Sequence, residues 1–406
     1  MVKKTPFYER TKDLNQTMLW EHWAGYLVAR RYQYSETFEY YAIRNSAGIF
    51  DTSPLFKYCI KGADATKFLC GVLARDVRTC PVGHAQYTIW CDDQGWLIED
   101  GVVLHVAEDE YWLASAEPNL RYLRKLVGYY DEVTITDMSE EYGILALQGP
   151  HSLNILAQLS DKIRDLAYFE LTQTEFAGKS VMVSRTGYTG DLGYEIWVGK
   201  EDAVAVWDAI MAAGAGYNIT PFGQKVLHIA RIDAGLLMID VEYHTARHAW
   251  TDEQRSSPIE LGFGWMFRKL KKDDRAFIGR RAIEKELAEK SSRWKLVGIE
   301  VDWRSYEKMY NDLGLMAPKD SSLIEEAMSL YVCNQNENKE WVGHTTSYVF
   351  STLLKKHIAI AKVDPAMSKV GTELQLELMV NDRPRVVKAR VVKMPFFNPA
   401  RKTAVN

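Results

Sequence analysis

Residues 185–196 read RTGYTGDLGYEI and form the most informative stretch of the chain. Its three glycines stand three residues apart between two apolar segments that predict strands, where glycine lets the backbone turn tightly or approach a ligand. Glu195 lies between Tyr194 and Ile196, so strand alternation places its carboxylate on the opposite face from both apolar neighbours. A carboxylate on a buried face needs a partner, and a planar ligand with adjacent N–H groups would supply one while the Tyr188 ring stacks on it. The alternative is a plain loop followed by an exposed strand glutamate.

Two adjacent acids, Glu99 and Asp100, interrupt the apolar stretch Trp96–Val103. Neighbouring strand residues point to opposite faces, so one of the two acids must point inward or into a cleft. An inward aspartate is a candidate acid or base, because burial perturbs its pKa. A sheet edge at a bulge is the alternative interpretation.

The composition narrows the class of protein. A chain of 406 residues predicts two or three domains. The net charge of -4 without a basic block makes nucleic acid an unfavourable partner. No apolar run reaches 18 residues, so no membrane span is expected, and the N-terminus does not resemble a signal peptide. Five cysteines without a C-x-x-C pair are typical of reduced thiols, which indicates a cytoplasmic location.

Local patterns predict an α+β fold. The stretch 36–45 has helical spacing, and the segments 86–90 and 97–105 flank an Asp/Gly cluster, which is typical of a hairpin. From residue 295 onward strands dominate, which predicts a separate C-terminal β domain.

Two further groups of residues are weaker candidates. Trp20, Trp23 and Tyr26 stand at helical spacing; such a stripe is more often core, although aromatic faces could also cage a methylated cation. His244 and His248 are four residues apart, as in a metal pair on a helix. No third ligand is evident in the sequence, so no metal is expected.

Several motifs, in their order along the chain, resemble the glycine cleavage T-protein family. The resemblance rests on SAGIFDTS, LIED, LALQGP, TGYTGDLGYEI and RIDAGL at 46–53, 97–100, 145–150, 186–196 and 231–236, with PIELGFGW, FIGR and KMPF further on. The glycine-rich motif is the specific one, and the resemblance extends over nearly the whole chain.

The resemblance implies a one-carbon transferase that uses tetrahydrofolate as co-substrate. It implies a catalytic role for Asp100 and folate contacts for Tyr87, Tyr188, Glu195 and, near a family asparagine, Ser115. The implied fold has three domains around a central folate channel, the last a β-barrel. The corresponding bounds are 1–55 with 140–270 for the folate-binding domain, 56–139 for a small domain carrying Asp100, and 290–406 for the barrel.

Departures from the family pattern favour its demethylase branch. Residues 226–228 read VLH where the family has A-R-D, residues 53–55 read SPL in place of S-H-M, and the stretch 303–338 is longer. We therefore expect transfer of a methyl group from a small methylated amine, sulfonium or ether to N5 of tetrahydrofolate. Trp20, Trp23, Tyr26 and Glu99 are the expected substrate contacts. The alternatives are the T-protein reaction itself, in which a lipoyl carrier protein is the partner, and a non-catalytic folate-binding protein.

Overall fold

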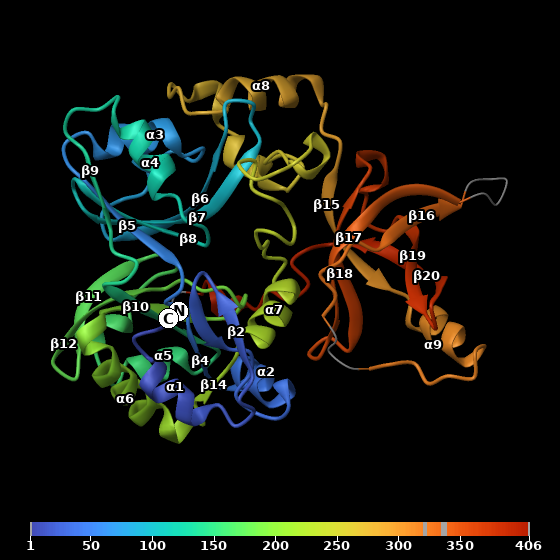
Figure 1. The fold of residues 1–406 in the computed structure, drawn as a ribbon, viewed down its shortest axis with the longest axis horizontal. Helices are drawn as coiled ribbons and strands as arrows, with labels where there is room; N and C mark the ends of the chain where they lie inside the picture. Colours follow the sequence, from blue (N-terminus) through green and yellow to red (C-terminus); the bar gives the residue numbers. More distant parts are fainter. Residues whose placement is uncertain (1, 320–322, 334–338, 405–406) are drawn as a thin grey trace.

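The structure is a computed structural model that describes residues 2–319, 323–333 and 339–404. Figure 1 shows three lobes, two of them built on open sheets and the third on a closed barrel. This mixed α/β arrangement with a C-terminal six-stranded barrel confirms the predicted fold class. In the described residues no helix has the length and apolar character needed to cross a membrane.

The first lobe holds a six-stranded sheet in the order β11-β12-β13-β10-β4-β14. Its strands are β4 (Gly48–Asp51), β10 (Tyr142–Gln148), β11 (Leu171–Phe176), β12 (Lys179–Ser184), β13 (Gly193–Gly199) and β14 (Thr220–Pro221). Its helices are α1 (Tyr8–Leu14), α2 (Glu36–Asn45), α5 (Ser152–Leu156), α6 (Ala203–Gly214) and α7 (Gln224–Asp233). The core lies between the sheet and α5 and α6, with Leu145, Ile196 and Trp207 among its buried members. A small sheet of β1 (Lys3–Lys4), β3 (Tyr26–Ala29) and β2 (Trp20–Trp23) precedes it.

The second lobe is a five-stranded sheet in the order β6-β7-β8-β5-β9. Its elements are β5 (Phe56–Lys61), α3 (Ala65–Val72), β6 (His84–Cys91), β7 (Leu97–Ala107), β8 (Glu110–Ser115), α4 (Leu120–Val127) and β9 (Thr134–Asp137). The helix α8 (Arg280–Glu289) lies at the outer end of this lobe (Figure 1). The predicted hairpin at 86–105 is confirmed as β6 and β7, which pair antiparallel.

The third lobe is the barrel, closed in the order β15-β18-β17-β16-β19-β20. Its elements are β15 (Lys295–Val301), α9 (Trp303–Asn311), β16 (Ser329–Cys333), β17 (Lys339–Ser351), β18 (Lys356–Val363), β19 (Glu373–Val380) and β20 (Arg383–Val392). Strand β17 contains a register shift between Thr345 and Ser347. The outer face of β18, with Ile358 and Ile360, packs against the core that contains α7.

The chain returns from the barrel to the first lobe (Figure 1). Arg185 Nη2 donates to the carbonyl of Ala404 at 2.7 Å. Arg401 donates two hydrogen bonds to the buried carboxylate of Asp191, at 2.6 and 2.8 Å. The C-terminal segment therefore fixes the glycine-rich loop, a contact that sequence patterns did not predict.

The helical interpretation of Trp20, Trp23 and Tyr26 is wrong. Ala24 and Gly25 have φ values of +48° and +89°, a tight turn that brings Trp23 opposite Tyr26 in an antiparallel hairpin. A spacing of three residues fits one face of a helix, but it also fits two strand residues that face each other across a two-residue turn, as Trp23 and Tyr26 do here. The predicted domain bounds stay a prediction.

Candidate functional site

Asp100 is held by two tyrosine hydroxyls, one on each carboxylate oxygen. Tyr87, on the neighbouring strand β6, donates to Oδ2 at 2.9 Å. Tyr243 donates to Oδ1, and its hydroxyl also accepts the backbone N–H of Asp100 at 3.1 Å. The side chain is thus fixed in one orientation while remaining partly accessible to solvent.

Burial and hydrogen bonding change the pKa of the Asp100 carboxyl group in opposite directions. Burial raises the pKa of Asp100, and the Tyr243 and Tyr87 hydroxyls partly offset that rise by stabilising the ionised form. Burial, with the neighbouring carboxylate, also raises the pKa of both tyrosines well above the ordinary value, so they remain donors. A carboxyl group whose pKa is raised in this way is a stronger proton acceptor than a free aspartate.

Glu99 faces the other side of the same strand and is fully buried. Its oxygens accept the backbone N–H of Glu117 at 2.7 Å and the Asn119 side-chain amide. Burial raises its pKa to about 8 despite these donors. Ser115 lies in the same buried group, where its hydroxyl donates to the Glu117 carbonyl at 3.0 Å. The structure therefore brings Glu99 and Ser115 together around the 115–119 loop, on the opposite face of β7 from Asp100.

The glycine-rich loop is shaped by Gln148, the glutamine of the LALQGP motif. A Cβ atom at Gly187 would lie 2.1 Å from the Gln148 amide, and one at Gly193 would lie 2.3 Å from it. The amide fills the loop from beneath, and Thr189 donates to its Oε1 at 2.9 Å. Two of the three glycines therefore make room for a buried side chain, a reason that differs from the tight turn or ligand approach expected from the sequence.

Glu195 and Tyr188 lie on the two sides of this loop. Glu195 is partly exposed, whereas Tyr194 and Ile196 on the opposite face are fully buried. Its Oε2 accepts the Thr186 hydroxyl, and burial raises its pKa. Within the described part of the chain Oε1 has no hydrogen-bond donor. The Tyr188 hydroxyl donates to the Leu237 carbonyl, which leaves its ring partly exposed.

Tyr188 and Asp100 belong to the same electrostatic neighbourhood. Burial is the largest cause that raises the pKa of Tyr188, and the charge of Asp100 raises it further, whereas Arg231 lowers it. Tyr87 is in turn affected by both Asp100 and Tyr188. The structure therefore groups Asp100, Tyr87 and Tyr188, with Tyr243 as an added member.

The residues of the predicted aromatic cage make packing contacts, and their role as substrate contacts stays a prediction. Trp20 borders a hollow of about 10 Å³, which also touches Phe50 and Asp51. Trp23 stacks on Phe50 with ring centroids 6.2 Å apart, and Tyr26 is buried. These contacts favour a packing role.

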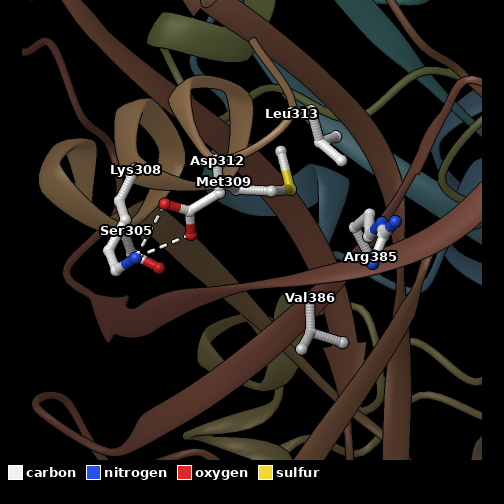
Figure 2. A pocket seen from close by; sticks show the side chains of 7 residues that line it. All are labelled: Ser305, Lys308, Met309, Asp312, Leu313, Arg385 and Val386. Carbon is white, nitrogen blue, oxygen red and sulfur yellow. Dashed lines mark hydrogen bonds and ion pairs between the residues drawn. The ribbon is translucent and has the colours of Figure 1, made fainter. Parts of the chain in front are cut away.

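Two other features lie apart from the grouped residues. His244 pairs with Asp240 at 3.4 Å, and in the described residues no group of three metal-ligating side chains occurs. A surface hollow of about 260 Å³ between α9 and β20 contains none of the predicted site residues (Figure 2). Its lining includes an ion pair between Lys308 and Asp312 at 2.6 Å.

Tyr243 and Asn119 were missed by sequence reasoning. Tyr243 stands directly before the His244–His248 pair, and its contact with Asp100 spans 143 positions, so no local spacing indicated it. Asn119 lies four residues after Ser115, the position to which the resemblance pointed, and its amide bonds the carboxylate of Glu99.

Comparison with known proteins places these features in a class. The GCVT N-terminal domain family matches residues 7–271, and the glycine cleavage T-protein C-terminal barrel domain family matches residues 313–398. The chain therefore belongs to the glycine cleavage T-protein family.

Individual relatives agree with this assignment. An aminomethyltransferase of Caldanaerobacter subterraneus is 30% identical over 98% of this chain and 96% of its own length. One of Thermotoga petrophila is 30% identical over 98% of both chains. Aminomethyltransferases are one-carbon transferases, so the predicted enzyme class is confirmed. The crystal structure of glycine cleavage system aminomethyltransferase T from Bartonella henselae has the same fold, with a TM-score of 0.79 at 21% identity over 98% of this chain and 99% of that one.

Proposed function

We propose that the protein is a tetrahydrofolate-dependent aminomethyltransferase that receives its one-carbon group from a lipoyl carrier protein. The sequence departures favoured a demethylase, but the full-length relatives carry the name aminomethyltransferase and support the alternative better. In the reaction that the family resemblance implies, the aminomethyl carbon passes to folate, ammonia leaves, and the carrier keeps a free thiol.

The residues at the glycine-rich loop suit a pterin ring. Glu195 presents an oxygen without a donor in the described chain, and adjacent N–H groups of a pterin would pair with that partly exposed carboxylate. The partly exposed ring of Tyr188 offers a flat surface beside it. Tetrahydrofolate, when bound, supplies the nucleophilic amine. We propose that Glu195 and Tyr188 hold its pterin and that Tyr87 lines the wall next to Asp100.

The clamp on Asp100 is the observation that carries the proposal. Two tyrosine hydroxyls hold both carboxylate oxygens, so the carboxylate is oriented before a substrate arrives. Because burial raises its pKa, this carboxylate can take a proton from a reacting amine and return it to a leaving one. We assign Asp100 that role and Tyr243 the role of its main positioning partner.

Demethylation of a small free substrate is the second candidate. The matched family regions leave residues 272–312 uncovered, and this interval includes α9. His228 also departs from the family pattern. We keep the domain bounds given above, the central folate channel and a cytoplasmic location as further proposals.

One experiment separates the two candidates. The purified protein is incubated with tetrahydrofolate and either an aminomethyl-loaded lipoyl carrier or a panel of methylated amines, sulfonium compounds and aryl ethers. We expect methylene-tetrahydrofolate and ammonia with the carrier, and little product with the panel. Formation of 5-methyl-tetrahydrofolate without a carrier, at a higher rate, would replace the proposal with the demethylase.

A further inference from the structure

A buried ionic network joins α7 to the barrel. Arg231 and Glu242 are both fully buried, and their side chains pair at 2.7 Å. The other arm of the Arg231 guanidinium pairs with Glu325 at 3.1 Å. One cation therefore bridges two carboxylates, one from the segment after α7 and one from the barrel lobe.

His228 is the second partner of Glu325. It lies on α7 three residues before Arg231, and its Nδ1 is 3.1 Å from the same Glu325 oxygen. Burial acts to raise the pKa of Glu325, but His228 and Arg231 outweigh it and hold that pKa below the ordinary value. The carboxylate is therefore ionised between two nitrogen groups.

His228 and Glu325 both lie where the sequence departs from the family pattern. His228 stands where the family pattern has an aspartate, and Glu325 lies in the longer stretch 303–338. An aspartate at position 228 would face Glu325 with like charge, which is unfavourable in a partly buried site. The two departures therefore compensate each other in space.

The backbone fixes Glu325 on the barrel. Its neighbour Ile324 exchanges two hydrogen bonds with Tyr348 of β17, at 2.8 and 2.9 Å. The register shift in β17 lies beside this point, so Thr346 and Ser347 both direct their hydroxyls to Glu242, at 3.2 and 2.7 Å. The barrel thus holds both carboxylates that flank Arg231.

Glu242 connects the network to the proposed folate site. Its Oε2 accepts the backbone N–H of Met238 at 2.7 Å, which closes the segment 237–243 into a tight turn. The first residue of that segment, Leu237, accepts the Tyr188 hydroxyl, and the last, Tyr243, holds Asp100. A displacement of this turn would move both contacts together.

We propose that Glu325 is a positioning residue that, with His228, holds Arg231 and through Glu242 keeps the 237–243 turn aligned with Asp100 and Tyr188. The inference rests on the proposed function and extends it to a chain-specific contact from the barrel. In this arrangement the barrel helps to align the carboxylate of Asp100.

The test is a double-mutant cycle at these two positions. Glu325→Gln removes the charge, and His228→Asp places two carboxylates against each other. We expect each single variant to lower kcat about tenfold, with the acidic limb of the pH profile moved to higher pH because the Tyr243 donor is displaced. The double variant should recover most of the activity, because the carboxylate introduced on α7 can then pair with Arg231 in place of Glu325. Glu326→Gln, at the exposed neighbour, is the matched control and should be unchanged.

The outcomes are distinguishable. Additive losses in the double variant, or single variants with the wild-type pH profile, overturn the positioning role of Glu325. Tetrahydrofolate affinity is measured in parallel by calorimetry, and melting temperatures show whether each variant folds. A wild-type protein that binds no tetrahydrofolate overturns the proposed function and this inference with it. If the wild-type protein binds folate but transfers no one-carbon group, the proposed reaction is wrong. The double-mutant cycle at positions 228 and 325 is then measured in folate affinity, and additive losses there would overturn the positioning role of Glu325.

Discussion

Removal of the Tyr243 hydroxyl tests the geometry around Asp100 most directly. In Tyr243→Phe the ring stays in its buried position while two contacts disappear. One is the donor to Asp100 Oδ1, and the other is the acceptor for the Asp100 backbone N–H at 3.1 Å. The Tyr87 hydroxyl, at 2.9 Å, then remains as a side-chain donor to the carboxylate.

The magnitude follows from the type of bond that is lost. A hydrogen bond to a charged group contributes about 1.5–3 kcal/mol. At about 1.36 kcal/mol per factor of ten, the variant should lose about 10–150-fold in kcat near neutral pH. The sign of the pH effect is also fixed: the hydroxyl favours the ionised carboxylate, so its loss raises the pKa of Asp100 further. The acidic limb of the kcat profile should move to higher pH, and part of the activity should return in alkaline buffer.

The assay is methylene-tetrahydrofolate formation from a loaded carrier across the pH range, with folate affinity measured separately. Tyr87→Phe should shift the pH profile of kcat in the same direction as Tyr243→Phe and by no larger amount. It loses one hydrogen bond to the carboxylate and no contact with the Asp100 backbone. Tyr129→Phe, at a residue 84% exposed, should match wild type. An unchanged acidic limb and unchanged kcat in Tyr243→Phe would refute the idea that this clamp sets the ionisation of Asp100.

Three further predictions address the same site. Glu195→Ala should weaken tetrahydrofolate binding by about 10–150-fold, from a lost charged hydrogen bond of about 1.5–3 kcal/mol; equal affinity by calorimetry would remove Glu195 from the site. Asp100→Asn should lower kcat by at least about 100-fold with little change in folate affinity, and wild-type turnover would make Asp100 structural. Glu99 has a folded pKa of about 8 against 4.5 for the free side chain, so its contribution to stability is complete below pH 4.5 and is lost as the pH rises to about 8. Urea unfolding should show this loss, at most about 5 kcal/mol, in wild type and not in Glu99→Gln; parallel pH curves for the two proteins would contradict it.

Local sequence signals were sufficient for much of the fold. The helix Glu36–Asn45 has the predicted bounds, because its apolar spacing lies within the segment and its cap, Ser35, directly precedes it. The β6–β7 hairpin follows from two apolar runs and the Asp/Gly turn between them. Strand alternation also placed Glu195 opposite its apolar neighbours. These features depend on neighbours a few residues away.

The remaining features depend on contacts between distant segments. Nothing near Tyr243 indicates that its hydroxyl meets Asp100. Gly187 suggested a tight turn or an approach to a ligand, whereas the Gln148 side chain from another strand occupies the space beside it. The pairing of Glu325 with His228 on α7 could not be predicted, because the two residues meet only in the folded chain. Such partners are selected by the packing of the three lobes, which no single window of sequence contains.

The contact between the glycine-rich loop and residues 401–404 also sets an order of events during synthesis. Arg185 and Arg401 are 216 positions apart, so a ribosome that adds about 5–20 residues per second makes the second one roughly 10–40 s after the first. During this interval Arg185 and Asp191 are without the C-terminal partners that hold them in the finished chain. The sheet of the first lobe can form earlier, and Gln148 and Arg44 already contact the loop that carries Tyr188 and Glu195. Its contacts with residues 401–404 form only after those residues have been made. A nascent chain is therefore expected to complete the contacts of this loop only after the residues of its barrel have been made, so chaperones would meet the first lobe before those contacts exist.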